Sequence, residues 1–286
     1  MILKEKYKLY NGVEIPKLGL GTWFINDNEV IKAVIDAASI GYRHIDTAQA
    51  YGNENGVGKG VKASGISREN MFITTKLGAE VKTYKEAVAS INTSLKKLGL
   101  DYIDLMIIHS PKPWANFLET EPYFEGNIEA WRALEEAYEA GKLRAIGVSN
   151  FEKADMDNIL ENCSIKPMVN QILAHISNTP SELIQYNQEK QILVEAYSPF
   201  GHGELFKNRQ VQAIAEKYKV SVSQLAIRYC LQLDLLPLPK TANPQHMKTN
   251  TEVDFVISDA DMLLLKNVKQ IENYGEHSGF PVFGKV

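Results

Sequence analysis

Eight short apolar runs rich in β-branched residues recur along the chain, and longer segments with helical spacing separate them. The pattern predicts eight strands, each followed by a helix. The predicted strands cover residues 18–22, 42–46, 71–76, 102–109, 143–149, 167–172, 192–197 and 235–240. The predicted helices cover residues 28–39, 53–63, 83–98, 126–140, 152–161, 180–189, 208–232 and 243–250.

Strands separated by helices imply crossover connections and a parallel sheet. Eight such units within 286 residues favour an α/β fold of the closed (β/α)8, or TIM, barrel type over an open sheet. Two segments lie outside this alternation. Residues 4–17, with Tyr10-Asn11-Gly12 at their centre, predict an N-terminal β-hairpin across the bottom of the barrel, and residues 258–272 predict an extra C-terminal helix.

The sequence contains no linker that would divide it into two domains. The length alone permits one domain or two, but no low-complexity run or Pro/Gly/Ser linker interrupts the chain. We therefore expect a single barrel domain over residues 1–286, with an irregular tail from 273 to 286.

Composition excludes several functional classes. Lys and Arg number 31 and Asp and Glu 35, a net charge of −4, which argues against a nucleic-acid partner. No apolar run approaches the roughly 18 residues of a membrane helix, and the charged N-terminus does not resemble a signal peptide.

Two cysteines, Cys163 and Cys230, predict buried thiols rather than a disulfide framework. We expect a cytoplasmic protein.

Common catalytic and phosphate-binding motifs are missing. The glycines at 52, 56, 58 and 60 have the wrong spacing for Gly-x-Gly-x-x-Gly, and no Walker loop, Gly-x-Ser-x-Gly or His-Glu-x-x-His is present. The six histidines are scattered singly, so no metal site is predicted.

Four ionisable residues stand where three consecutive predicted strands end. Asp46, Lys76 and His109 each close a strand, and Tyr51 lies in the loop after the first of them. Each of the four alone is typical of a structural residue. Together they are predicted to meet at one mouth of the barrel, where the catalytic groups of such barrels lie.

These four side chains suit the reduction of a carbonyl group. A Lys76 ammonium held by Asp46 favours the phenolate of Tyr51 and lowers its pKa from the ordinary value near 10. Tyr51 then protonates the oxygen on which negative charge develops, while His109 positions that oxygen. Side chains cannot supply a hydride, so a nicotinamide cofactor is implied.

The chain resembles the aldo-keto reductase superfamily, in particular its small bacterial members, over residues 9 to about 273. Six segments carry the resemblance in the expected order. They are Gly41-Tyr-Arg-His-Ile-Asp46-Thr-Ala with Tyr51-Gly-Asn-Glu54, Leu98-Gly-Leu-Asp-Tyr-Ile-Asp-Leu-Met-Ile-Ile-His109-Ser-Pro111, Gly141-Lys-Leu-Arg-Ala-Ile-Gly-Val-Ser-Asn150-Phe, Asn170-Gln171, Ala196-Tyr-Ser-Pro199 and Leu238-Pro-Lys240-Thr241.

The resemblance implies a barrel that binds NADPH without a Rossmann domain, which agrees with the missing glycine fingerprint. It makes Tyr51 the general acid, tuned by Lys76 and Asp46, and His109 the residue that orients the substrate. It places further residues along the coenzyme. These are Ser149, Asn150 and Gln171 at the carboxamide, Tyr197 on the nicotinamide ring, Thr22 and Ser198 near the ribose and pyrophosphate, Phe200 and Glu204 in the covering loop, and Lys240, Thr241, His246 and Asn250 at the adenosine end.

Two departures from the family pattern affect specificity. His246 stands where family members often carry an Arg that grips the 2′-phosphate, so we expect weaker NADPH selectivity and possible NADH use. Ser110 stands where many members carry Trp, which predicts an opened substrate pocket walled by Trp23 and Trp114, with Phe117 beside them.

Two other functions stay open at this point. Lys76 at a barrel strand end also fits a Schiff-base lyase, and a coenzyme-binding barrel with a sensor or partner role fits the same motifs. For the reductase, the apolar loops after the strands suggest a small or medium carbonyl substrate, an aldehyde or an α-keto compound, and a monomer is the family default.

Overall fold

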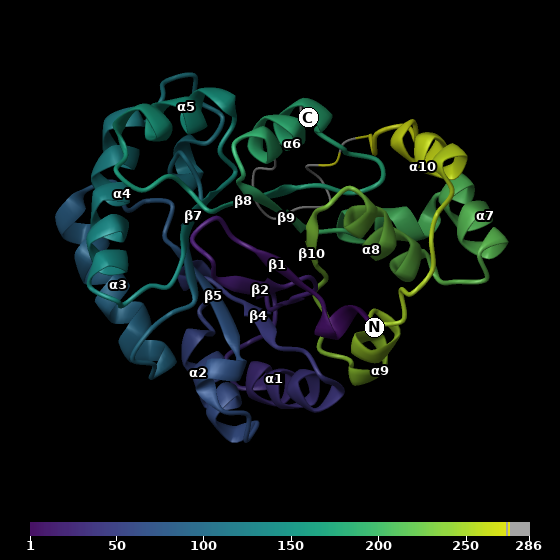
Figure 1. Cartoon of the computed structure of the whole chain (residues 1–286), viewed down its shortest axis with the longest axis horizontal. Coiled ribbons are helices and arrows are strands. Elements are labelled where there is room, and N and C mark those ends of the chain that lie inside the picture. Colours follow the sequence, from purple (N-terminus) through teal and green to yellow (C-terminus); the bar gives the residue numbers. More distant parts are fainter. Residues whose placement is uncertain (273, 275–286) are drawn as a thin grey trace.

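The eight predicted strands form a nearly closed parallel barrel in the computed structural model, which describes residues 1–272 and 274 (Figure 1). The strands follow one another around the sheet in chain order, and every hydrogen-bonded pair is parallel. They are β3 (Leu20–Gly21), β4 (His44–Asp46), β5 (Phe72–Leu77), β6 (Leu105–Ile108), β7 (Ile146–Ser149), β8 (Val169–Leu173), β9 (Leu193–Tyr197) and β10 (Leu236–Leu238).

The first and last strands of the barrel approach each other. The amide of Gly21 donates to the carbonyl of Pro239 at 3.1 Å, and Gly21 forms a parallel bridge with Lys240. Residues far apart in the sequence therefore meet at this seam, which places the loop after β10 beside the loop after β3.

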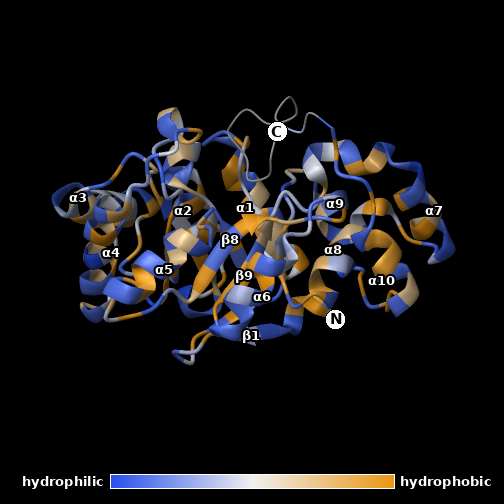
Figure 2. Cartoon of the chain, turned by 90° about the horizontal axis from the view of Figure 1, so that it is seen from above, coloured by the Kyte–Doolittle hydropathy of each residue, from blue (hydrophilic) through white to orange (hydrophobic). Residues whose placement is uncertain are grey.

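Helices surround the strands in a ring (Figure 1). They are α1 (Glu29–Ile40), α2 (Glu54–Ala63), α3 (Tyr84–Leu98), α4 (Phe124–Glu139), α5 (Lys153–Asn162), α6 (Ser181–Glu189), α7 (Arg209–Lys217), α8 (Val222–Gln232), α9 (Pro244–Thr249) and α10 (Asp259–Lys266). Figure 2 shows hydrophilic residues on the outer surfaces of these helices and hydrophobic stretches along the central strands. The helices thus bury one apolar face each against the barrel.

Two helix predictions are wrong in extent. The segment 208–232 is two helices, α7 and α8, because the chain turns through Lys219 with a φ of 57° and Ser221 then caps α8 in a capping box with Gln224. The extra helix predicted over 258–272 is α10 alone, which ends at Lys266. The turn that follows buries Val268 in the core cluster of this part of the barrel. Of the predicted irregular tail, all but Tyr274 lies outside the described residues.

The N-terminal hairpin is confirmed and closes the bottom of the barrel. Strands β1 (Lys6–Lys8) and β2 (Glu14–Pro16) pair antiparallel. The Tyr7 hydroxyl donates to the carbonyl of Leu235 at 3.2 Å, and the Asn11 amide donates to the carbonyl of Arg144 at 3.0 Å. Both carbonyls lie just before a barrel strand begins, so the hairpin covers the amino-terminal ends of the strands and leaves the carboxyl ends open. Figure 1 shows β1 across the middle of the ring, and Figure 2, turned by 90°, shows it at one edge of the molecule.

The described part of the chain contains no helix that is both long and apolar enough to cross a membrane.

Candidate active site

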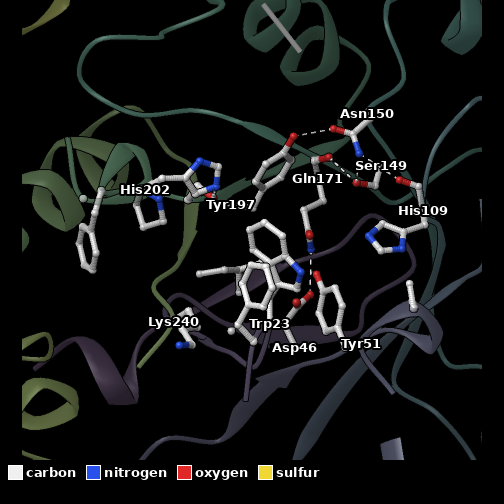
Figure 3. A pocket seen from close by; sticks show the side chains of 18 of the residues that line it. Trp23, Asp46, Tyr51, His109, Ser149, Asn150, Gln171, Tyr197, His202 and Lys240 are labelled. Carbon is white, nitrogen blue, oxygen red and sulfur yellow. Dashed lines mark hydrogen bonds between the residues drawn. The ribbon is translucent and has the colours of Figure 1, made fainter. Parts of the chain in front are cut away.

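Three of the four predicted catalytic side chains, Asp46, Tyr51 and His109, line one pocket at the carboxyl end of the barrel (Figure 3). The fourth, Lys76, is buried against Asp46 and Tyr51. Asp46 is the last residue of β4, and Lys76 is the next to last of β5. Tyr51 ends the 3₁₀ helix Gln49–Tyr51, and His109 directly follows β6. The strand register thus carries three of these residues to the same mouth, and the short helix after β4 returns the fourth to it.

Lys76 is the centre of this cluster. Its ammonium is fully buried and donates to Asp46 Oδ2 at 2.6 Å, to the Thr47 carbonyl at 3.0 Å and to the Tyr51 hydroxyl oxygen at 3.1 Å. An ammonium has three protons, and these contacts use all of them. The Tyr51 oxygen therefore acts as an acceptor toward Lys76, and its own proton is left for another partner.

Burial and the neighbouring charges act on the pKa values of both Lys76 and Tyr51, and both values end above their ordinary ones. Burial alone lowers the pKa of Lys76, but Asp46 and Tyr51 outweigh it, so the pKa of Lys76 lies above its ordinary value. Burial raises the pKa of Tyr51, and Lys76 offsets only part of that rise. The expectation that Lys76 makes Tyr51 a net stronger acid is thus wrong for this structure, because desolvation exceeds the effect of the ammonium. Tyr51 is protonated at neutral pH and carries a proton to give.

His109 is buried, and its ring meets Tyr51 edge-on at a centroid distance of 5.7 Å. Burial, with help from the Lys76 charge, lowers the pKa of His109 well below its ordinary value. The imidazole is therefore neutral at physiological pH. A neutral imidazole can donate one hydrogen bond to a substrate oxygen without competing as an acid.

Polar side chains from β7, β8 and β9 form the opposite wall. Asn150, at a φ of 62° that asparagine tolerates, turns its amide back so that Nδ2 donates to the His109 carbonyl at 3.0 Å and to Ser149 Oγ at 3.1 Å. Its Oδ1 accepts from the Tyr197 hydroxyl at 2.8 Å. Gln171 Nε2 donates to Asp46 Oδ1 at 2.9 Å, which links this wall to the catalytic cluster (Figure 3).

The pocket between these walls has a volume of about 410 Å³ and aromatic sides. Trp23 and Trp114 line it as expected, and so do Phe200 and Lys240. Ser149, Asn150, Gln171, Tyr197 and Ser198 line it as well.

Some predicted site residues do not line this pocket. Thr22 is fully buried and donates its hydroxyl to the Asp46 carbonyl at 2.9 Å, so it supports the site from behind. Ser110 is buried too, and Phe117 stacks on Trp114 at a centroid distance of 5.8 Å. Glu204 pairs with Lys207 at 2.7 Å within the 3₁₀ segment Gly201–Lys207.

The predicted adenosine-binding residues lie on one continuous stretch. Lys240 and Thr241 follow β10, His246 is an exposed residue of α9, and Asn250 is buried directly after α9. The seam with β3 brings this stretch to the rim of the same pocket, since Lys240 and Gly21 both line it.

Sequence reasoning missed several residues of the site. The pocket is also lined by Phe24, Ala50, His202, Phe206 and Leu238, which come from loops or a strand whose facing only the fold decides. Glu195 was missed inside the barrel, where it accepts from Gln171 Nε2 at 2.7 Å. A signal for Glu195 existed, because it is the single charged residue in the apolar run 192–197. Among residues 1–272 and 274, no group of three or more His, Cys, Asp or Glu is arranged to hold a metal ion.

Comparisons with known proteins agree with this geometry. The model of the aldo/keto reductase family matches residues 17–270. The chain is 40% identical to glyoxal reductase of Bacillus subtilis over 96% of both chains, and 36% identical to aldehyde reductase YPR1 of Saccharomyces cerevisiae over 96% of both. An aldo-keto reductase of the silkworm Bombyx mori, solved in complex with NADPH, superposes with a TM-score of 0.84 at 33% identity, covering 93% of this chain and 88% of that one.

The match spans nearly the whole barrel, and the four-residue cluster lies inside the matched region. The chain belongs to the aldo/keto reductase family.

Proposed function

We propose that this protein reduces small aldehydes and α-dicarbonyl compounds to alcohols with NADPH, and that Tyr51 is the proton donor. One observation carries the proposal. Lys76 donates its three N–H groups in hydrogen bonds to Asp46, to the Thr47 carbonyl and to the Tyr51 oxygen. The phenol proton of Tyr51 therefore remains available beside His109 in the pocket.

The residues present suit a nicotinamide coenzyme. Both N–H groups of the Gln171 amide are engaged inside the barrel, so its oxygen is the group left to accept from a primary amide such as the coenzyme carboxamide. Ser149 and Asn150 stand beside it, and the Tyr197 ring offers a flat face in the same pocket. When bound, the coenzyme supplies the hydride that side chains cannot.

The chain's own residues then manage the charge that develops on the substrate oxygen. His109 orients that oxygen with a hydrogen bond, and Tyr51 gives it a proton. Lys76 stabilises the phenolate that remains, and Asp46 keeps Lys76 charged. Asp46 and Lys76 act through Tyr51, so they are positioning residues in this scheme.

The pocket and the relatives support the substrate class. A cavity of about 410 Å³ with walls of Trp23, Phe24 and Trp114 accommodates small, flat or apolar carbonyl compounds. The matched relatives are named as reductases of glyoxal and of aldehydes. We also propose that Lys240 favours NADPH, that His246 in place of Arg permits NADH, and that the protein acts as a cytoplasmic monomer.

The test is oxidation of NADPH and NADH by the purified protein with glyoxal, methylglyoxal and benzaldehyde. Turnover with NADPH, and slower turnover with NADH, is the expected result. Coenzyme binding without turnover on any carbonyl would instead favour a sensor role. Trapping of a carbonyl compound on Lys76 by borohydride would favour a Schiff-base lyase.

A further inference from the structure

Glu195 is a buried carboxyl group inside the barrel that the proposed proton transfer does not use. It lies on β9, two residues before Tyr197, and its side chain is fully buried. Gln171 Nε2 donates to Glu195 Oε2 at 2.7 Å and to Asp46 Oδ1 at 2.9 Å. The Gln171 amide thus bridges Glu195 to the Asp46–Lys76 pair.

This bridge determines which atom Gln171 offers to a ligand. A primary amide has two N–H groups, and the two carboxyl groups take both. Rotation of the amide by half a turn would place its oxygen against the Asp46 carboxylate. The amide oxygen of Gln171 therefore stays available on the pocket side.

The charges around Glu195 leave it without a cation of its own. Asp46 of β4 and Lys76 of β5 are the charged groups that face it, and they pair with each other at 2.6 Å. The neighbouring strand positions, Gln171 of β8 and Leu236 of β10, do not titrate. Burial, then the Asp46 charge, raises the pKa of Glu195 to about 8. Glu195 Oε1 has no hydrogen-bond partner among the residues that the structure describes.

We propose that Glu195 is a positioning residue whose protonation follows the oxidation state of the coenzyme, an inference that rests on the proposed function above. A neutral carboxyl beside Gln171 suits the neutral reduced nicotinamide ring. An ionised carboxylate suits the oxidised ring, which carries a positive charge. Glu195 therefore loses its proton more readily in the complex with NADP⁺ than in the complex with NADPH.

The experiment measures the Kd of NADP⁺ and of NADPH by calorimetry from about pH 6 to about pH 10. Tyr51→Phe is the background, so that no phenol titrates at the site, and Glu195→Gln in that background is the matched comparison. The ratio of the two Kd values cancels the titration of the 2′-phosphate, because both coenzymes carry that group.

With Glu195 present, the ratio of Kd for NADP⁺ to Kd for NADPH should fall about tenfold as the pH rises through 8, the change that one unit of pKa difference produces. In the Glu195→Gln variant the ratio should stay constant within about twofold. NADP⁺ binding near pH 8 should also release protons, measured in buffers of different ionisation enthalpy, only when Glu195 is present.

A ratio that does not change with pH in the presence of Glu195 would overturn the inference while leaving the reductase proposal intact. The same pH dependence in the Glu195→Gln variant would overturn it too, by assigning the titration to another group. The absence of proton release on NADP⁺ binding near pH 8 in the protein that keeps Glu195 would overturn the inference as well, so a folding defect of Glu195→Gln does not prevent the test. Failure of the wild type to bind either coenzyme would overturn the proposed function and this inference with it.

Discussion

Single buried side chains determine the chemistry of this site. Lys76 holds the Tyr51 oxygen as an acceptor, and so decides which way the phenol can give its proton. Asn150 uses a left-handed backbone conformation to connect the His109 carbonyl to Tyr197. In both cases the role of the residue depends on which of its donors and acceptors other groups have already taken.

Tyr51→Phe should lower kcat by about 10²- to 10⁴-fold, because it removes the proton donor. The Kd of NADPH should change little, since Phe keeps the ring and its contacts. Steady-state NADPH oxidation and a coenzyme titration measure the two quantities.

Tyr7→Phe is the matched control for this variant. It removes a phenol hydroxyl that bonds Leu235 at the opposite end of the barrel. It should leave kcat within about twofold of the wild type. Normal kcat in Tyr51→Phe would show that Tyr51 is not the acid.

His109 should produce no inflection in the pH dependence of kcat. Its pKa lies well below the ordinary value, because burial and the Lys76 charge both disfavour the imidazolium. The ring is therefore neutral at pH values near and above the ordinary histidine pKa. The check is a profile at saturating coenzyme and substrate. An inflection near the ordinary histidine pKa that disappears in His109→Gln would contradict this prediction.

At the scale of the elements, close helix packing explains a glycine cluster that fits no phosphate-binding motif. Gly56, Gly58 and Gly60 lie buried along α2, where it packs between α1 and α3. A Cβ built on Gly58 would lie 1.9 Å from the Leu98 carbonyl oxygen, and one on Gly56 would lie 2.0 Å from the Asp27 carbonyl oxygen. These glycines allow the backbone of α2 to lie directly against neighbouring backbone, because any residue with a Cβ would clash there.

Gly58→Ala should lower the free energy of unfolding by about 2 to 3 kcal/mol or more, because α2 must move away from the end of α3. Urea denaturation followed by circular dichroism measures the change. Lys59→Ala, at an exposed neighbouring position of the same helix, is the control and should lie within about 0.5 kcal/mol of the wild type. Equal stability of the two variants would show that α2 has room to shift.

Lys82 links the loop after β5 to the loop after β6 and to helix α4. Its ammonium donates to the Ser110 carbonyl and to Asn127 Oδ1, both at 2.8 Å. Lys82→Met removes both donors, which should cost about 1 to 2 kcal/mol of stability. It should raise the KM for the carbonyl substrate more than it lowers kcat, because Ser110 begins the loop that carries Trp114.

Unfolding curves and steady-state kinetics of Lys82→Met test this connection. The matched control is Lys85→Met, an exposed position at the start of α3. An unchanged KM in Lys82→Met would show that this contact does not hold the substrate loop in place.

For the whole molecule, closure of the barrel brings the predicted adenosine-binding stretch to the pocket that Tyr51 lines. The stretch from Lys240 to Asn250 lies about 190 residues after Tyr51 in the chain. It reaches the rim of the same pocket because β10 meets β3 at the seam. In the proposed function, discrimination between coenzymes would thus be made where Lys240 lines the pocket, and proton transfer would take place at Tyr51.

His246→Arg should raise the preference for NADPH over NADH in kcat/KM by about tenfold, because Arg brings a permanent charge and a planar fork that matches a phosphate. Turnover with NADH should change little. Kinetics with both coenzymes at fixed substrate measure the ratio, and Lys248→Arg on the same helix is the control. An unchanged ratio would show that His246 does not face the 2′-phosphate.

The sequence by itself determined the architecture. The eight apolar runs, the hairpin and the four strand-end residues were all readable, because burial requires local patterns of period two or 3.6 and parallel strands bring their carboxyl ends together. The break between α7 and α8 was not readable, because apolar positions continue on both sides of Lys219 and Ser221.

Only the tertiary structure decided the electrostatics and the pocket. Whether the pKa of Tyr51 lies below or above its ordinary value depends on its burial as well as on Lys76. That burial comes from strands distant in sequence. Glu195 became part of the site because the register of β8 and β9 sets it opposite Gln171. A sequence states which groups exist along the chain, whereas their desolvation and their partners arise only when the barrel closes.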